Sequence, residues 1–241
     1  DVYDPKKDFI VCTNHFQSNG LSKTKMNIEQ ENESASTYRY KRLTELLNAN
    51  ARLPNGQGKN TVQKTVNILR DQKGLKGANI GMGNEKAINQ LIAHHSIVFE
   101  PKKLIVWVST SPWQLGQYVA YDLNKIFALK GMKENKEIAD SSLTIAPDSF
   151  LLTPAYKNFE VFRNIKQQML DGETANPKTL VSSNPEFYNA YVLAGDYLYK
   201  QKEYAAALQN YNAALTKVIA TKKEEDHIKE QIKKINKKLA P

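Results

Sequence analysis

The chain has 241 residues, of which 41% are hydrophobic, and its 34 Lys and Arg against 25 Asp and Glu give a net charge of +9. This composition excludes disorder of the whole chain, because a polypeptide of this length can bury the core of one large or two modest domains. The single cysteine, Cys12, excludes an internal disulfide framework and a Cys-rich zinc site.

The hydropathy pattern predicts no membrane span. The most apolar stretch, Leu104–Thr110, suits a buried strand and is far shorter than the roughly 18–20 residues that cross a bilayer. The sequence begins at Asp1 without an initiator Met or a signal-peptide pattern, which predicts a processed or truncated piece of a longer chain. The location therefore stays open, and a periplasmic or exported protein is compatible with it.

Much of the positive charge lies in the C-terminal tail. Lys217–Pro241 contains eight Lys and four acidic residues, so it supplies +4 of the +9. The charges alternate with isoleucines and a leucine, which is typical of the solvated face of an amphipathic helix rather than of a phosphate-binding patch. No RNA-recognition motif or zinc finger accompanies the tail, and we expect no nucleic-acid partner.

In chain order, the first predicted element is a short buried strand at Asp8–Asn14, which has β-branched and aromatic residues. Gln17–Glu33 is polar and is predicted to form a surface loop. A helix follows, with Ser34 or Ser36 as its N-cap. Its buried face is predicted to consist of Tyr40, Leu43, Leu46 and Leu47.

The predicted elements between residues 53 and 127 include a helix, a hairpin and one segment of ambiguous type. Leu53–Gly58 breaks the chain, and Thr61–Leu69 is predicted to be a second helix. Ala87–Glu100 and Lys103–Ser109 resemble a hairpin of long strands whose imperfect alternation indicates that both sheet faces are covered. Gln117–Phe127 suits a strand or a helix. Segregated strands and helices favour an α+β domain over residues 1–150.

Residues 151–241 are predicted to be entirely helical. Thr153-Pro154 is a helix start, with a capping hydroxyl before a proline at the first helical position, and Asn184-Pro185 repeats that signal. One copy of the tetratricopeptide pattern follows, at Tyr191, Ala194, Gly195, Leu198, Ala207, Tyr211 and Ala214. A single repeat cannot form a peptide-binding solenoid, so we expect this segment to dock on the α+β domain.

The sequence contains no convincing motif for a metal ion or a dinucleotide cofactor. His94 and His95 are adjacent, and on a strand their rings would point to opposite faces, which disfavours a shared metal ion. Gly81-Met82-Gly83 has Lys86 where a dinucleotide fingerprint needs its third glycine. We therefore expect no metal and no cofactor. The thiol of Cys12, inside the predicted apolar strand, is expected to be structural.

The most informative residues are Asn14, at the exit of the first predicted strand, and Arg39, early in the following helix. A fixed amide donor at a strand end can stabilise the oxyanion of an acyl-transfer intermediate, and an arginine nearby can hold a thiolate or a carboxylate. From the residues alone, Asn14 is equally well a loop cap and Arg39 a surface salt-bridge partner.

The order of motifs resembles a known family. Thr13-Asn14-His15-Phe16, a variable loop, Thr37-x-Arg39-x-x-Arg42, a helix ending in Leu69-Arg70-Asp71 and the paired strands within Ile88–Ser111 are similar to the C-terminal half of the acyl-coenzyme A:6-aminopenicillanate acyltransferase group. This group is related to penicillin V acylases and bile salt hydrolases, which are N-terminal-nucleophile hydrolases with an αββα core. The resemblance covers roughly residues 5–130.

The resemblance implies a cysteine amidase or acyltransferase that acts on linear amide bonds of a small acylated substrate. Self-cleavage of a precursor would expose an N-terminal Cys, whose thiolate attacks the carbonyl while its α-amine handles the proton. By resemblance, Asn14 contributes to the oxyanion hole, and Arg39 lies beside the nucleophile, with Arg42 as the second choice for that role.

The chain departs from that pattern in its nucleophile. Asp1 cannot serve as one, and Cys12 precedes the Thr-Asn motif in mid-strand. The expected partner is therefore an upstream segment of the same precursor that carries the nucleophile, and this chain alone is expected to be inactive. The helical residues 151–241 would be an appended lid or brace. The alternative is a non-catalytic scaffold that binds a protein through the tetratricopeptide-like segment.

Overall fold

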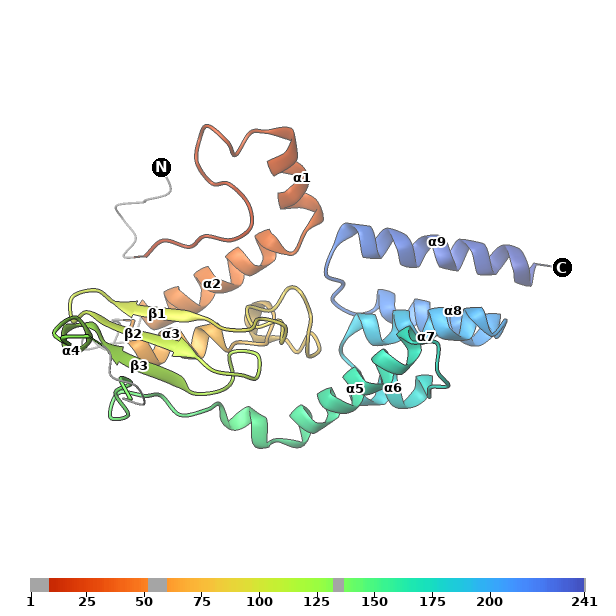
Figure 1. Cartoon of the computed structure of the whole chain (residues 1–241). Coiled ribbons are helices and arrows are strands. Elements are labelled where there is room, and N and C mark those ends of the chain that lie inside the picture. Colours follow the sequence, from red (N-terminus) through yellow and green to blue (C-terminus); the bar gives the residue numbers. More distant parts are fainter. Residues whose placement is uncertain (1–8, 52–59, 132–136, 241) are drawn as a thin grey trace.

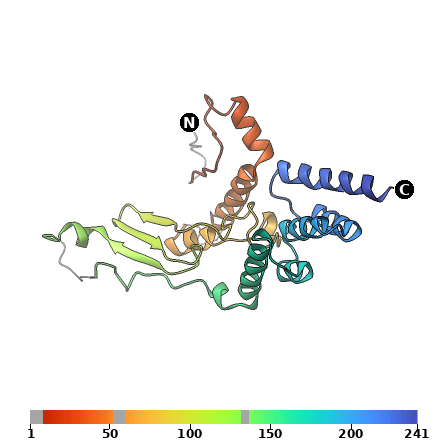
Figure 2. The same ribbon diagram turned by 45° about the vertical axis from the view of Figure 1, so that its right-hand side comes forward.

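The computed structural model of the chain describes residues 9–51, 60–131 and 137–240. A three-stranded antiparallel sheet lies toward one end of the molecule and a helical bundle toward the other (Figures 1 and 2). The described α-helices are α1 Lys25–Glu33, α2 Ser36–Ala51, α3 Val62–Leu69, α4 Leu123–Phe127, α5 Pro154–Leu170, α6 Pro177–Ser183, α7 Tyr188–Lys200, α8 Tyr204–Leu215 and α9 Lys222–Leu239. The strands are β1 Ile97–Glu100, β2 Ile105–Ser109 and β3 Tyr118–Asp122, and short 3₁₀ helices span η1 Leu75–Gly77 and η2 Ser149–Leu152.

The sheet follows the order β1-β2-β3, and Val98, Trp107 and Ala120 lie opposite one another in the register. The predicted hairpin is confirmed, but the prediction of a strand over all of Ala87–Glu100 is wrong, because β1 begins only at Ile97. The ambiguous run Gln117–Phe127 divides into β3 and then α4, whose N-cap is the last residue of β3. The coarse prediction of mixed α and β structure is therefore correct.

One face of the sheet is covered by α3. Val66 of this helix is fully buried against Val98, Trp107 and Tyr118. The predicted helices α2 and α3 are both present, and the Thr61 side chain caps α3 as its position suggests. The predicted chain break between them, residues 53–58, lies outside the described residues.

The N-terminal segment differs most from its prediction. Residues 9–14 do not form a strand, because a strand needs a neighbour and the described chain offers only an isolated bridge from Thr13 to His15. The predicted loop over residues 17–33 contains α1 instead. This helix lacks an apolar stripe and is anchored by the buried Asn27, whose amide bonds both backbone groups of Phe16.

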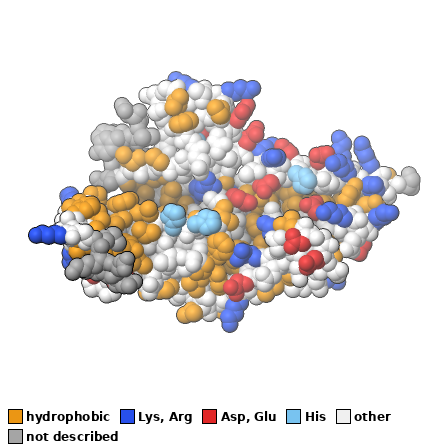
Figure 3. All heavy atoms as spheres, viewed as in Figure 1, with side chains coloured by type: hydrophobic (Ala, Val, Ile, Leu, Met, Phe, Trp, Pro, Cys, Tyr) orange, Lys and Arg blue, Asp and Glu red, His pale blue; other side chains and the backbone are white. Residues whose placement is uncertain are grey.

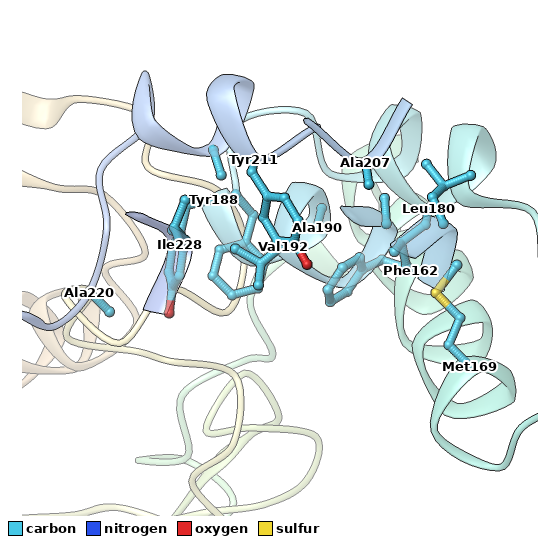
Figure 4. Close-up of a cluster of buried hydrophobic side chains, with 14 of the residues drawn as sticks. Phe162, Met169, Leu180, Tyr188, Ala190, Val192, Ala207, Tyr211, Ala220 and Ile228 are labelled. Atoms are coloured by element: carbon cyan, nitrogen blue, oxygen red, sulfur yellow. The ribbon is translucent and has the colours of Figure 1, made fainter. Parts of the chain in front are cut away.

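The helical bundle is built from α5 to α9. Thr153 caps α5 with Pro154 in the first turn, as predicted. The helix start predicted at Asn184-Pro185 is wrong, because Asn184 ends α6 and α7 begins at Tyr188. Figure 4 shows side chains of the bundle core, among them Phe162, Met169, Leu180, Tyr188, Ala190, Val192, Ala207, Tyr211, Ala220 and Ile228.

Helices α7 and α8 form an antiparallel hairpin, and a glycine allows their close approach. A Cβ atom at Gly195 would lie 3.0 Å from the Tyr211 ring. The Tyr211 hydroxyl donates a hydrogen bond to Asp196, 2.5 Å away, which fixes the ring between the helices. Helix α9 covers this hairpin with its buried Ile228 and Ile235.

The bundle is joined to the rest of the chain by polar and steric contacts. The Asn184 side chain pairs with both backbone groups of Met82, at 3.0 and 2.7 Å. The buried amide of Asn84 donates to the Val218 carbonyl oxygen at 2.8 Å. Gly81 lies so close to Phe187 that a Cβ there would come within 2.3 Å of the Phe187 Cα atom. The helical segment is thus docked, as expected.

We predict that Gly81→Ala weakens this docking far more than Gly77→Ala. Both glycines have positive φ angles, +83° and +73°, but a Cβ at Gly77 would meet no atom within 4 Å. Backbone strain alone should cost each variant about 1–2 kcal/mol. The clash with Phe187 should add about 1–3 kcal/mol to the loss for Gly81→Ala. Urea unfolding measures both variants, and equal losses would contradict the close contact.

Candidate functional site

The structure brings the two candidate site residues together. Arg39 Nη2 donates a hydrogen bond to Asn14 Oδ1 at 2.5 Å, and Arg39 Nη1 donates to the Glu85 carbonyl oxygen at 2.6 Å. Because a guanidinium only donates, the Asn14 oxygen must face Arg39, and its Nδ2 therefore points away. Within the described residues, Nδ2 of Asn14 has no hydrogen-bond acceptor. Its N–H groups are free for a ligand.

The residues on either side of Asn14, Thr13 and His15, are both held by Ser36. The Ser36 hydroxyl lies 2.8 Å from His15 Nδ1 and 3.1 Å from the Thr13 hydroxyl. The Thr13 hydroxyl and His15 Nδ1 lie 3.1 Å apart. Ser36 is fully buried at the start of α2, so this triangle ties the segment to the helix that carries Arg39. The His15 ring also makes an edge contact with Tyr40, with ring centroids 5.8 Å apart.

A shallow groove of about 450 Å³ runs along this segment and is lined by residues 12–18. Asn14 is exposed there. Cys12 is exposed in the same groove, which overturns the expectation of a thiol buried in an apolar strand. The prediction failed because no neighbouring strand covers this stretch in the described part of the chain.

The two arginines of the motif have different environments. Burial lowers the pKa of Arg39, partly offset by the charge of Glu85. Arg42 is almost fully buried and forms two hydrogen bonds with the Asp71 carboxylate, at 2.8 and 3.0 Å, which raise its pKa. Arg42, the second choice for the site, is thus occupied by Asp71 and lies apart from the groove lining.

Glu85 is a neighbour of the site that sequence reasoning missed. Burial raises the pKa of its carboxyl group, and the charge of Glu224 raises it further. A hydrogen bond from the Tyr188 hydroxyl, at 3.4 Å, and the charge of Lys166 act in the opposite direction. Glu85 therefore links the backbone that holds Arg39 to α7 of the bundle. No local pattern marks it, because its partners lie about a hundred residues away.

Residues 9–51, 60–131 and 137–240 contain no cluster of three or more His, Cys, Asp or Glu side chains suited to a metal ion. His94 and His95 lie in a bend before β1, not on a strand as the sequence argument assumed. Among the described helices, none combines the length and the apolar character that crossing a bilayer requires.

Comparison of the chain with protein-family models, with characterised proteins and with solved structures finds no match.

Proposed function

We propose that this chain supplies the oxyanion donor and the neighbouring arginine of a cysteine N-terminal-nucleophile amidase or acyltransferase. The supporting observation is the Asn14–Arg39 pair, in which the arginine fixes the amide oxygen and leaves the amide N–H groups of Asn14 free in an open groove. An oxyanion hole requires hydrogen-bond donors that are already in position before the reaction begins.

The proposed reaction uses a cysteine from an upstream segment of the same precursor. Its thiolate attacks the carbonyl carbon of a small acylated amide, and the oxygen gains negative charge that Asn14 Nδ2–H stabilises. The C–N bond then breaks as the α-amine of the cysteine passes a proton to the leaving amine. Water or a second amine takes the acyl group from sulfur and restores the thiol.

The apolar face of the sheet opposite α3 supports the proposal that another segment of the precursor packs on it. One face packs on α3, whereas the opposite face carries six apolar side chains, of which Ile97 and Phe99 are exposed and the other four are partly buried. They are Ile97, Phe99, Val106, Val108, Val119 and Tyr121. Ile97 is 46% and Phe99 63% exposed, and Figure 3 shows hydrophobic side chains gathered over the sheet. Face-to-face sheet packing buries such a surface, and we propose the upstream segment as its partner.

The scaffold alternative is less well supported. A binding module would need an exposed apolar groove on the α7–α8 hairpin. Instead, Ile228 and Ile235 of α9 are fully buried on that hairpin, and Asn184 joins the bundle to Met82. We therefore propose that the tetratricopeptide-like segment braces the α+β part.

The experiment compares this chain with a precursor that includes the segment encoded immediately upstream of Asp1. Both are assayed on a panel of N-acyl p-nitroanilides. We expect the precursor, after self-cleavage, to release p-nitroaniline and the isolated chain to release none. Equal activity in the two proteins would contradict the proposal, because the isolated chain begins with Asp1 and lacks the N-terminal cysteine.

A further inference from the structure

A pocket of about 650 Å³ lies between the turns that follow α3 and the helical bundle. Arg70, Gln72 and Lys73 line it on one side. On the other side it is lined by η2, the first turns of α5 and the residues that connect α6 to α7. The pocket shares no lining residue with the groove at Asn14. The two sites are thus separate, and we name this one the Arg70 pocket.

The guanidinium of Arg70 has two N–H groups that bond no described protein atom. Arg70 is only 7% exposed, and an arginine side chain carries five N–H donors. Nε donates to the Gln114 carbonyl oxygen at 3.3 Å, and Nη2 donates to those of Gly116 and Ala146 at 2.6 and 2.9 Å. These bonds use three donors. Both N–H groups of Nη1 are left without an acceptor in the described part of the chain.

The Nη1 atom is accessible from the pocket. Among the described residues, the fully buried side-chain nitrogen and oxygen atoms without a hydrogen bond belong to Trp113 and Asn189, so the unbonded Nη1 of Arg70 is not one of them. Nη1 therefore has accessible surface, and Arg70 lines the pocket. The Tyr118 ring, whose centre lies 5.1 Å from Arg70 Cζ, also holds the guanidinium. A donor that is fixed in this way binds a ligand with little loss of side-chain entropy.

The charge of Arg70 is only partly compensated. One carboxylate oxygen of Asp148 lies 4.0 Å from Arg70 Nε, and the other accepts from the Phe150 N–H at 2.8 Å. Burial lowers the pKa of Arg70, and the charge of Asp148 offsets this effect only in part. A buried cation with a distant counter-charge favours the binding of an anion.

The other acidic residues of the lining already have cationic partners. Asp71 bonds Arg42 through both carboxylate oxygens, and Glu186 lies 3.1 Å from Lys217 Nζ. Lys73, by contrast, is exposed at the pocket and forms no ion pair with a described residue. Lys73 thus adds a positive charge that no described carboxylate balances, and a singly charged anion would balance it.

We propose that the Arg70 pocket binds a small monocarboxylate with an apolar body. One carboxylate oxygen accepts from Arg70 Nη1–H, and Lys73 supplies a second positive charge. The apolar body packs against Met82 and Phe150, which line the same pocket. A doubly charged phosphate fits less well, because Asp148 lies beside the guanidinium. The site does not depend on the amidase proposal, because it shares none of the reacting groups.

The test is isothermal titration of the chain with benzoate and with benzamide, which has nearly the same shape but no charge. We expect benzoate to bind with a Kd of about 1 mM or tighter. Benzamide should bind at least about tenfold more weakly, since it loses a charge-assisted hydrogen bond. Inorganic phosphate should also bind more weakly than benzoate. Absence of heat with benzoate at millimolar concentration, equal affinity for benzoate and benzamide, or tighter binding of phosphate would each overturn the proposal.

Two matched substitutions on α5 test the location without changing Arg70, on which three backbone carbonyl groups depend. Asn158→Asp adds a negative charge to the pocket lining, whereas Asn164→Asp adds it at an exposed position of the same helix outside the pocket. Asn158→Asp should weaken benzoate about tenfold and leave benzamide unchanged, because only the anion is repelled. Asn164→Asp should alter neither.

Lys73→Gln tests the second positive charge. It should weaken benzoate about threefold, since an exposed cation contributes less than a buried one. Lys76→Gln, which changes an exposed lysine of the same turn outside the pocket lining, is the control. Benzoate binding that neither Asn158→Asp nor Lys73→Gln alters would place the ligand elsewhere and overturn the proposal. Circular dichroism confirms that each variant is folded.

Discussion

Asn14→Ala in the self-cleaved precursor is expected to lower the turnover of an acylated amide by about 10²–10³-fold with little change in KM. The reason is that Asn14 Nδ2–H meets the carbonyl oxygen only when that oxygen becomes negative. Steady-state kinetics on the best p-nitroanilide of the panel measures the effect. Turnover that survives Asn14→Ala would contradict the oxyanion assignment.

A second variant separates chemistry from positioning. Asn14→Asp keeps an oxygen that can accept from Arg39, so the contact observed at 2.5 Å is retained. It has no N–H to offer the oxyanion, and a carboxylate there repels the developing charge. We expect it to be at least as inactive as Asn14→Ala, although it is folded. Asn67→Ala, which removes an exposed amide on α3, should leave turnover unchanged.

Arg42→Ala is expected to cause the largest loss of stability, about 3–5 kcal/mol. The substitution removes the ion-pair partner of Asp71, whose side chain is only 13% exposed. The Asp71 carboxylate is then left mostly buried without the positive charge of Arg42. The Asp71 carbonyl oxygen also accepts from the Asn89 N–H at 2.8 Å, so the damage should extend to the turn that contains Asn89. Urea unfolding monitored by tryptophan fluorescence gives the free energy of unfolding.

Two variants control for the size of that effect. Arg42→Lys keeps the charge but cannot reproduce the two-pronged geometry, so it should fall between the wild type and Arg42→Ala. Lys41→Ala removes an exposed cation from the neighbouring position and should change stability by no more than about 0.5 kcal/mol. A loss in Arg42→Ala as small as that in Lys41→Ala would mean that the Asp71 pair carries little stability.

Local capping chemistry explains which helices the sequence predicted correctly. Thr61 and Thr153 each cap their helix through a hydroxyl that accepts from a backbone N–H three residues later, a signal contained in a few neighbouring residues. Asn184 has the same appearance in sequence. Its side chain instead bonds the Met82 backbone, 102 residues away, so no helix starts at Asn184.

The prediction of a strand at residues 8–14 shows a different limit. Apolar composition indicates a preference for extended backbone, but a strand forms only where another strand pairs with it. The same limit applied to Cys12, whose burial was inferred from the strand. In α1, the anchor is the single buried Asn27 rather than an apolar stripe, so hydrophobic periodicity could not reveal the helix.

The candidate site was only partly accessible from sequence. Asn14 and Arg39 were chosen through their order within a family resemblance, and the residues alone left each of them with a structural alternative. Their hydrogen bond spans 25 positions and depends on how α2 packs beside the Thr13–Phe16 segment. No local sequence pattern indicated Glu85, since its contact with Tyr188 depends on the docking of the bundle.

The position of the acyl group in the acyl-enzyme shows directly which residue is the nucleophile. The self-cleaved precursor is mixed with an activated acyl donor, quenched in acid and mapped by peptide mass spectrometry. We predict that the acyl group is on the N-terminal cysteine of the upstream segment, and that Cys12→Ser leaves the labelling unchanged. An acyl group on Cys12, which is exposed in the same groove as Asn14, would contradict the proposed division of the active site.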